Sequence, residues 1–178
     1  MTTEEIKYAL NSEHLKLSLF DKLNHYGIAF VFLTVPIIYT FLKGKSLFTN
    51  EKINSDSRTL ILVGIFTLIG FIYLIVQKRQ LKFKSISTKL SESEIIALIK
   101  NVCDEKEWTV FDFGKNYFKI KTFSDLLSGS FGEEITVIID RKRVLMNSKC
   151  KLSKRNYLFS NPNTENINAF FEKIKASS

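Results

Sequence analysis

Side chains that could act as general bases or nucleophiles are few and scattered in this sequence. His14 and His25 are its two histidines, and on a continuous helix they would lie about 16 Å apart along the axis. That separation is too large for the two rings to share a metal ion. Glu133 and Glu134 are adjacent in a predicted strand, so their carboxylates should point to opposite faces of a sheet. The sequence therefore predicts no catalytic carboxylate pair and no metal centre.

Glycine and cysteine chemistry is not indicated either. Residues 128–132 (SGSFG) lack the lysine of a phosphate-binding loop and the strand–helix context of a dinucleotide site. Cys103 shares a predicted helical face with Ile99, and Cys150 ends a predicted strand, so both thiols are interpreted as structural and reduced. We predict a protein that is not an enzyme and that uses no cofactor.

Two uncharged apolar runs dominate the elements around these residues. Residues 26–42 (YGIAFVFLTVPIIYTFL) and 59–76 (TLILVGIFTLIGFIYLIV) contain no Asp, Glu, Lys or Arg. As helices, each would cover at least about 25 Å of a hydrocarbon core that is about 30 Å thick. A core helix of a soluble protein would carry a polar stripe, which both runs lack. The pattern predicts a transmembrane helical hairpin over residues 25–77, with a polar connecting loop at 43–58.

The distribution of basic residues predicts the orientation of this hairpin. The segments before and after the two runs contain eight Lys and Arg residues and the loop between them contains four, with the clearest cluster in QKRQLKFK after the second run. This bias favours cytoplasmic termini for a two-pass protein. Residues expected at the membrane interface are Tyr26, Tyr39, Tyr73, Lys78 and Arg79.

Residues 1–24 are predicted to be an amphipathic helical segment with a break at residues 11–12. Ser12 could cap a second helix that continues toward the bilayer. Ile6, Leu10, Leu17 and Phe20 fall on one broad face, which leaves two interpretations open. The segment could lie along the membrane surface, or it could pack on the protein's own soluble domain.

Residues 82–178 are predicted to form a cytoplasmic α+β domain. Ser91 and Glu94 form a capping box for a helix. Alternating segments at 108–113 and 117–122 predict a hairpin, and a second hairpin ends with residues 143–150. Residues 82–88 are an edge strand or a linker, 157–159 could add a strand, and a final helix follows. The order α-β-β-β-β-α predicts a two-layer domain with an antiparallel sheet and both helices on one face. The expected core residues are Trp108, Phe118, Ile120, Val137, Ile139, Phe170 and Phe171.

The C-terminal segments resemble small uncharacterised bacterial membrane proteins that have two spans and a compact α+β domain. The resemblance covers GEEITVIIDRKRVLMNSKC at 132–150, NYFKIKT before it and NTENINAFFEKI after it. It implies a bacterial inner-membrane location and this fold, and it carries no activity and no functional residues.

Two features of the domain are less easily explained by folding alone. The connection 123–132 carries Leu126, Leu127 and Phe131, although surface loops are usually polar. It could fold back as a lid on the core or dock on a partner. The predicted hairpin turn at Arg141, Lys142 and Arg143 is basic, and could be a solvated turn or a contact for headgroups or an acidic partner. We predict that these six residues form one membrane-proximal partner-binding surface.

These observations predict a non-enzymatic accessory or scaffold subunit of the bacterial inner membrane. Its partners would be the lipid bilayer and either another protein of a membrane complex or further copies of itself. The alternative is a ligand-sensing membrane effector whose soluble domain binds a small molecule and controls association of the spans. The net charge of +8 is accompanied by no recognition motif for nucleic acid, so no nucleic-acid partner is expected.

Overall fold

A computed structural model describes residues 1–49, 57–122, 132–150 and 162–177 of this chain. The chain divides into two compact units. One contains Leu17–Arg79, and the other combines Met1–Lys16 with Gln80–Ser178. The N-terminal residues therefore belong with the C-terminal domain, although the whole hairpin separates them in sequence.

The first unit contains α2 (Leu19–Thr49) and α3 (Ser57–Gln80), each long and apolar enough to cross a membrane. Phe32 of α2 stacks on Tyr73 of α3 with ring centroids 5.6 Å apart. Gly70 permits this close approach, because a Cβ there would lie 2.7 Å from Cγ of Leu33. Helix α2 extends to Thr49, so the first part of the predicted loop is helical, and residues 50–56 lie outside the described residues.

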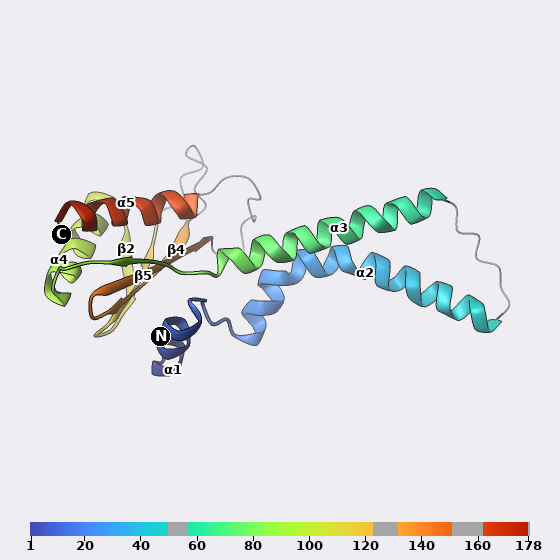
Figure 1. The fold of residues 1–178 in the computed structure, drawn as a ribbon, viewed down its shortest axis with the longest axis horizontal. Helices are drawn as coiled ribbons and strands as arrows, with labels where there is room; N and C mark the ends of the chain where they lie inside the picture. The colour runs from blue at the N-terminus through green and yellow to red at the C-terminus, as the bar shows by residue number, and fades with distance from the viewer. Residues whose placement is uncertain (50–56, 123–131, 151–161, 178) are drawn as a thin grey trace. The chain divides into compact units, whose positions relative to one another are not determined.

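The second unit contains a five-stranded antiparallel sheet in the order β1-β5-β4-β3-β2 (Figure 1). Residues 84–87 form an edge strand rather than a linker, whereas a strand at 157–159 falls outside the described residues. The strands are β1 (Lys84–Ser87), β2 (Thr109–Phe113), β3 (Tyr117–Lys121), β4 (Glu133–Asp140) and β5 (Arg143–Cys150).

Helices α4 (Glu92–Glu105) and α5 (Pro162–Ser177) cover one face of this sheet. Ser91 and Glu94 form the predicted capping box at the start of α4. Alternate residues of the central strands point toward these helices and are buried with them. Of the expected core, Phe118, Ile120, Val137, Ile139 and Phe170 are buried, while Trp108 and Phe171 pack on it partly exposed.

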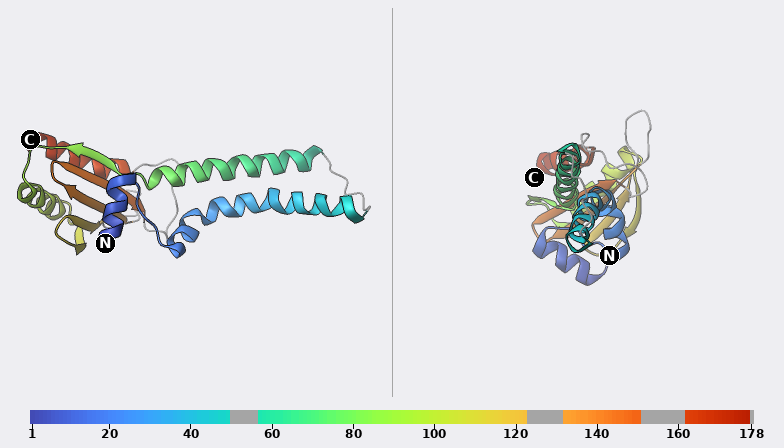
Figure 2. Two further views of the ribbon diagram at one scale, coloured as in Figure 1. Left: turned by 60° about the horizontal axis from the view of Figure 1, so that its bottom comes forward. Right: turned by 90° about the vertical axis from the view of Figure 1, so that its right-hand side faces the viewer.

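Helix α1 (Thr3–Ser12) packs against the opposite face of the sheet, so the domain has three layers rather than two (Figure 2). Ala9 is buried there together with Ile138 and Leu145 of β4 and β5. Ser12 ends this helix instead of capping the next one, because residue 13 adopts a left-handed conformation with φ 53°. Of the two interpretations of the N-terminal segment, packing on the protein's own domain holds for α1.

The segments on either side of the helical hairpin are hydrogen-bonded to each other. Leu15 N donates to Leu81 O, and Phe83 N donates to Glu13 O, both at 2.8 Å. His14 and Lys82 form the antiparallel bridge between them. The chain therefore enters the sheet from α3 beside the same segment that leads into α2.

Cys103 lies on the buried face of α4, within the core, where burial raises the pKa of its thiol to about 11. Because the thiolate is the reactive form, a disulfide reagent at about pH 8 should label Cys103 slowly in the native protein and quickly after unfolding. The measurement requires a Cys150→Ser background. Native-state labelling as fast as that of an added Ser93→Cys thiol would contradict this placement.

Candidate docking surface at one end of the sheet

Three connections of the domain meet at one end of the sheet. The β4–β5 turn contacts the β1–α4 connection, since Thr88 N donates to Lys142 O at 2.9 Å. The β2–β3 hairpin joins the same end, since Ile139 N donates to Asn116 O at 2.8 Å. The exposed side chains at this end define what we call the tip surface, which consists of Lys89, Phe113, Lys115, Arg141 and Lys142.

The backbone of the β4–β5 turn presents its basic residues at some conformational cost. Arg141 has φ 54°, in the left-handed region where glycine would be less strained. Asp140 and Arg143 face each other across the turn, and their side chains form an ion pair at 3.3 Å. Positive φ is common in two-residue hairpin turns, and Glu13 and Glu107 adopt similar values elsewhere in the described residues.

The cations of the tip surface have few acidic neighbours. Lys89, Lys115, Arg141 and Lys142 are exposed, and none forms an ion pair with another residue in the described ranges. Arg143 differs, because it also approaches Glu13 at 4.0 Å. The tip surface is therefore a source of positive potential that no ion pair within the described residues neutralises.

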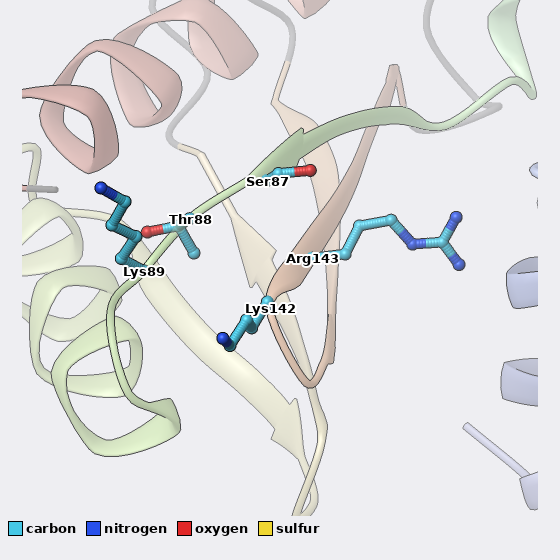
Figure 3. A pocket seen from close by; sticks show the side chains of 5 residues that line it. All are labelled: Ser87, Thr88, Lys89, Lys142 and Arg143. Carbon is cyan, nitrogen blue, oxygen red and sulfur yellow. The ribbon is translucent and has the colours of Figure 1, made fainter.

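An open depression of about 470 Å³ lies beside the turn and is lined by Ser87, Thr88, Lys89, Lys142 and Arg143. Figure 3 shows Lys89 and Lys142 extending to one side of the β1–β5 pair and Arg143 to the other. The three cations thus do not converge on one point. This geometry suits a broad acidic surface better than it suits a single enclosed anion.

Phe113 supplies an apolar group to the tip surface. Phe113 is 71% exposed, and its ring stacks on that of Phe118 with centroids 6.5 Å apart. The adjacent turn requires Gly114, because a Cβ there would lie 2.4 Å from Cε1 of Tyr117. In the sequence, Phe113 is explained by the strand alternation and is not among the predicted partner-binding residues. The feature that could have indicated it is its position as the last residue of a strand, directly before a glycine turn.

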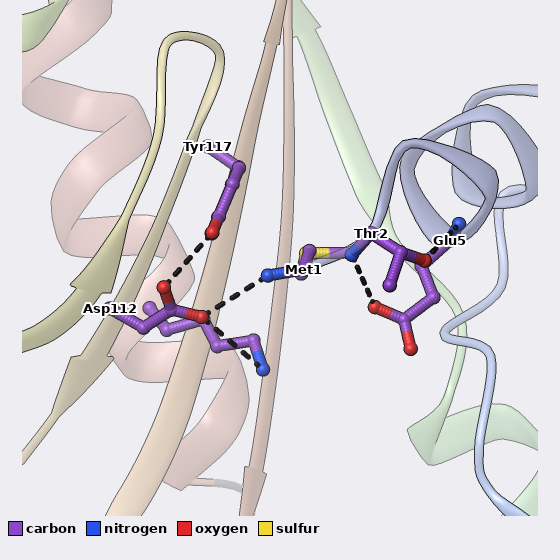
Figure 4. A network of polar contacts seen from close by, with 6 residues as sticks. Met1, Thr2, Glu5, Asp112 and Tyr117 are labelled. Atoms are coloured by element: carbon purple, nitrogen blue, oxygen red, sulfur yellow. Dashed lines mark hydrogen bonds and ion pairs between the residues drawn. The ribbon is translucent and has the colours of Figure 1, made fainter.

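A polar network holds the β2–β3 hairpin against α1 (Figure 4). Asp112 accepts hydrogen bonds from the Tyr117 hydroxyl at 2.9 Å and from the Met1 amino group at 3.2 Å. The Tyr117 bond is the main cause of the lowered pKa of Asp112, and it raises the pKa of Tyr117. Both shifts favour the ionised carboxylate as an acceptor. The network therefore orients the hairpin that carries Phe113.

The two halves of the partner-binding surface predicted from sequence are attached to different ends of the sheet. Leu126, Leu127 and Phe131 lie outside the described residues, but Thr122 and Gly132 on either side of their segment lie at the start of β4. Arg141, Lys142 and Arg143 follow the end of β4, whose eight residues span about 25 Å. The basic half of this predicted surface lies within the described residues, at the same end of the sheet as Phe113.

The predicted interface residues all lie on the two long helices. Lys78 and Arg79 are exposed in the last turn of α3, and Tyr39 is partly exposed on α2. Tyr26 packs edge-on to His25, while Tyr73 stacks within the hairpin, so part of its ring area is used there. Their position relative to a bilayer stays a prediction.

The residues considered for catalysis have structural contacts. The His14 ring lies 2.7 Å from Ser12 O, and His25 Nε2 lies 2.8 Å from Gln77 O. Glu133 is buried and accepts a hydrogen bond from the Thr122 hydroxyl. Within the described residues, no group of three or more His, Cys, Asp or Glu side chains could hold a metal ion.

Comparison of this chain with family models, curated proteins and solved structures finds no match.

Proposed function

We propose that this protein is a non-enzymatic accessory subunit of the bacterial inner membrane, with a domain that docks an acidic segment of a partner protein at the tip surface. One observation carries the proposal. Exposed cations without described ion-pair partners lie at the same end of the sheet as an exposed phenylalanine. An aromatic anchor beside a basic rim is a common composition for a protein-binding surface.

The two kinds of side chain would contribute differently to docking. Phe113 would be desolvated in an apolar recess of the partner and would account for much of the affinity. Arg141 and Lys142 would steer and orient an acidic segment, so their effect should weaken as salt screens it. The polar network at Asp112 would hold the hairpin in the orientation needed for binding.

The ligand-sensing alternative has one observation in its favour, namely the depression beside Lys142. A small-molecule site usually encloses most of its ligand. This depression is open and its cations diverge, so the docking function is preferred. The pocket that the alternative expected beneath residues 123–132 concerns residues largely outside the described ranges.

The proposal includes a two-pass topology with both termini in the cytoplasm. A Ser55→Cys variant in intact cells should react with a membrane-impermeant maleimide, while a Ser178→Cys variant should react only after lysis. Both variants need a background without Cys103 and Cys150. The opposite labelling pattern would place the domain outside the cell and refute the orientation inferred from the Lys and Arg bias.

Purification from native membranes in mild detergent tests the docking function. Phe113→Ser should reduce partner retention at all salt concentrations, because it removes the apolar contact. The double variant Arg141→Glu/Lys142→Glu should reduce retention mainly at low ionic strength. Phe111→Ser and Lys100→Glu/Lys106→Glu are matched controls, since they change exposed residues outside the tip surface.

Each outcome of this experiment has a definite meaning. Loss of the same partner from both tip variants, with both controls retaining it, would support docking at the tip surface. A protein that always elutes alone as a monomer would refute the accessory function. Equal retention by all variants would place the contact elsewhere. If the retained partner is another copy of the chain, light scattering will identify a homo-oligomer.

A further inference from the structure

Helix α2 begins well before the uncharged run that starts at Tyr26. Ser18 caps it, since Asp21 N donates to Ser18 Oγ at 3.1 Å and Lys22 N donates to Ser18 O at 2.9 Å. The Ser18 hydroxyl also donates to the Asp21 carboxylate at 2.8 Å. These contacts define a helix start that contains charged residues, within the same continuous helix as the apolar run.

The first turns of α2 have one apolar side and one side that faces α3. Leu19, Phe20 and Leu23 are 81%, 73% and 65% exposed, and their spacing places them on one helical face. On the other side, His25 is buried and its Nε2 lies 2.8 Å from Gln77 O of α3. The His25 contact therefore sets the rotation of these turns and directs the three apolar side chains away from α3.

The apolar portion of α2 is longer than an untilted helix needs to cross the hydrocarbon core. This portion, Leu19–Lys43, has 25 residues, equivalent to about 37 Å, against a core of about 30 Å. The excess of about five residues includes Asp21 and Lys22, which are costly to place in hydrocarbon. Figure 1 shows the first turns of α2 inclined to the rest of the helix. These turns fit the boundary between headgroups and acyl chains better than either water or the core.

We propose that residues 19–25 form an interfacial anchor, with Leu19, Phe20 and Leu23 inserted among the outer acyl carbons and Lys22 among the lipid headgroups. A lipid surface is the occupant because the exposed face continues along the same helix into Phe30 and Val31, which are 51% and 67% exposed. Amphipathic turns of this kind bury their apolar side about 5–10 Å into the interface. The proposal rests on membrane insertion of α2 and is independent of docking at the tip surface.

Depth-dependent fluorescence quenching in the full-length protein tests this anchor. Trp108 is the single tryptophan, so a Trp108→Phe background allows Phe20→Trp to be the only emitter. The protein is reconstituted into phosphatidylcholine vesicles brominated either near the headgroup end or near the methyl end of the acyl chains. Val31→Trp in the same background is the matched control, because it lies about 16 Å further along the helix, near the bilayer centre.

Emission from Phe20→Trp should be blue-shifted and quenched more by the shallow bromines than by the deep ones. Val31→Trp should show the reverse order, and wild-type Trp108 should be quenched by neither. Water-like, unquenched emission from Phe20→Trp alongside normal quenching of Val31→Trp would overturn the proposal. Stronger quenching of Phe20→Trp by the deep bromines would also overturn it, by placing these turns within the span. Because both reporters are exposed, neither replacement should disturb the fold.

Discussion

Replacing Phe170 with alanine should lower the free energy of unfolding by about 3–5 kcal/mol, because it removes a fully buried ring from a close-packed core. Phe170 has 0% exposure and packs on Trp108 with ring centroids 5.6 Å apart. Its side chain extends from α5 into the core against the sheet, so its loss weakens the packing of the last helix on the sheet. The cavity would have little means of collapsing, since strands on one side and α4 on the other hold its walls.

Trp108 provides the measurement for this variant, because its fluorescence reports directly on the packing around Phe170. Denaturant unfolding of the full-length protein in detergent should show a lower midpoint for Phe170→Ala. Phe171→Ala is the matched control, and its loss should be smaller because Phe171 is only partly buried. An unchanged midpoint for Phe170→Ala would mean that the final helix does not dock at Trp108.

Asn147→Asp should destabilise the domain by several kcal/mol, since it replaces a buried donor with a carboxylate. Asn147 is 1% exposed, and its Nδ2 donates to Gln80 O at 2.9 Å and to Lys82 O at 3.0 Å. A carboxylate cannot donate to these carbonyls, so the variant would bury a charge beside two unpaired acceptors. The segment that leads from α3 into the sheet should detach first.

The loss in Asn147→Asp should shrink at acidic pH, where the carboxyl group is protonated and can donate one hydrogen bond. Thermal unfolding as a function of pH measures this dependence, with Asn168→Asp as an exposed control on α5. Proteolysis near Lys82 should become faster in the variant at neutral pH. Equal melting temperatures for the variant and wild type at neutral pH would show that Asn147 does not hold this segment.

Much of the fold could be predicted from sequence because its signals are local. Two long apolar runs identify the helices of the hairpin, and Ser91 with Glu94 marks the start of α4. Period-two alternation locates β3, whose buried and more exposed residues alternate, and the side of β4 that carries Ile135, Val137 and Ile139. The same alternation places Phe118, Ile120 and Val137 in the core, and the structure confirms all three.

The candidate site could be predicted only in part, for a similar reason. The basic residues at 141–143 are visible as a charged turn between two alternating segments. The phenylalanine that lies beside these basic residues cannot be identified from such a local pattern. It is the register of β3 against β4 that brings Phe113 to the same end of the sheet. The apolar segment 123–132 was the obvious candidate by composition, yet its attachment points lie at the other end of β4.

The amino-acid sequence by itself therefore determined the two apolar helices, the strands of the two hairpins and the apolar sides of these elements, while it left residues 82–88 open between an edge strand and a linker. Each depends on residues within a few positions of one another. Tertiary structure alone decided that α1 covers the second face of the sheet. It also decided that Phe113 lies with the basic turn. The physical reason is that an amphipathic helix can bury its apolar side against lipid or against protein at similar gain, and the choice depends on the uncovered surface formed by Ile138 and Leu145.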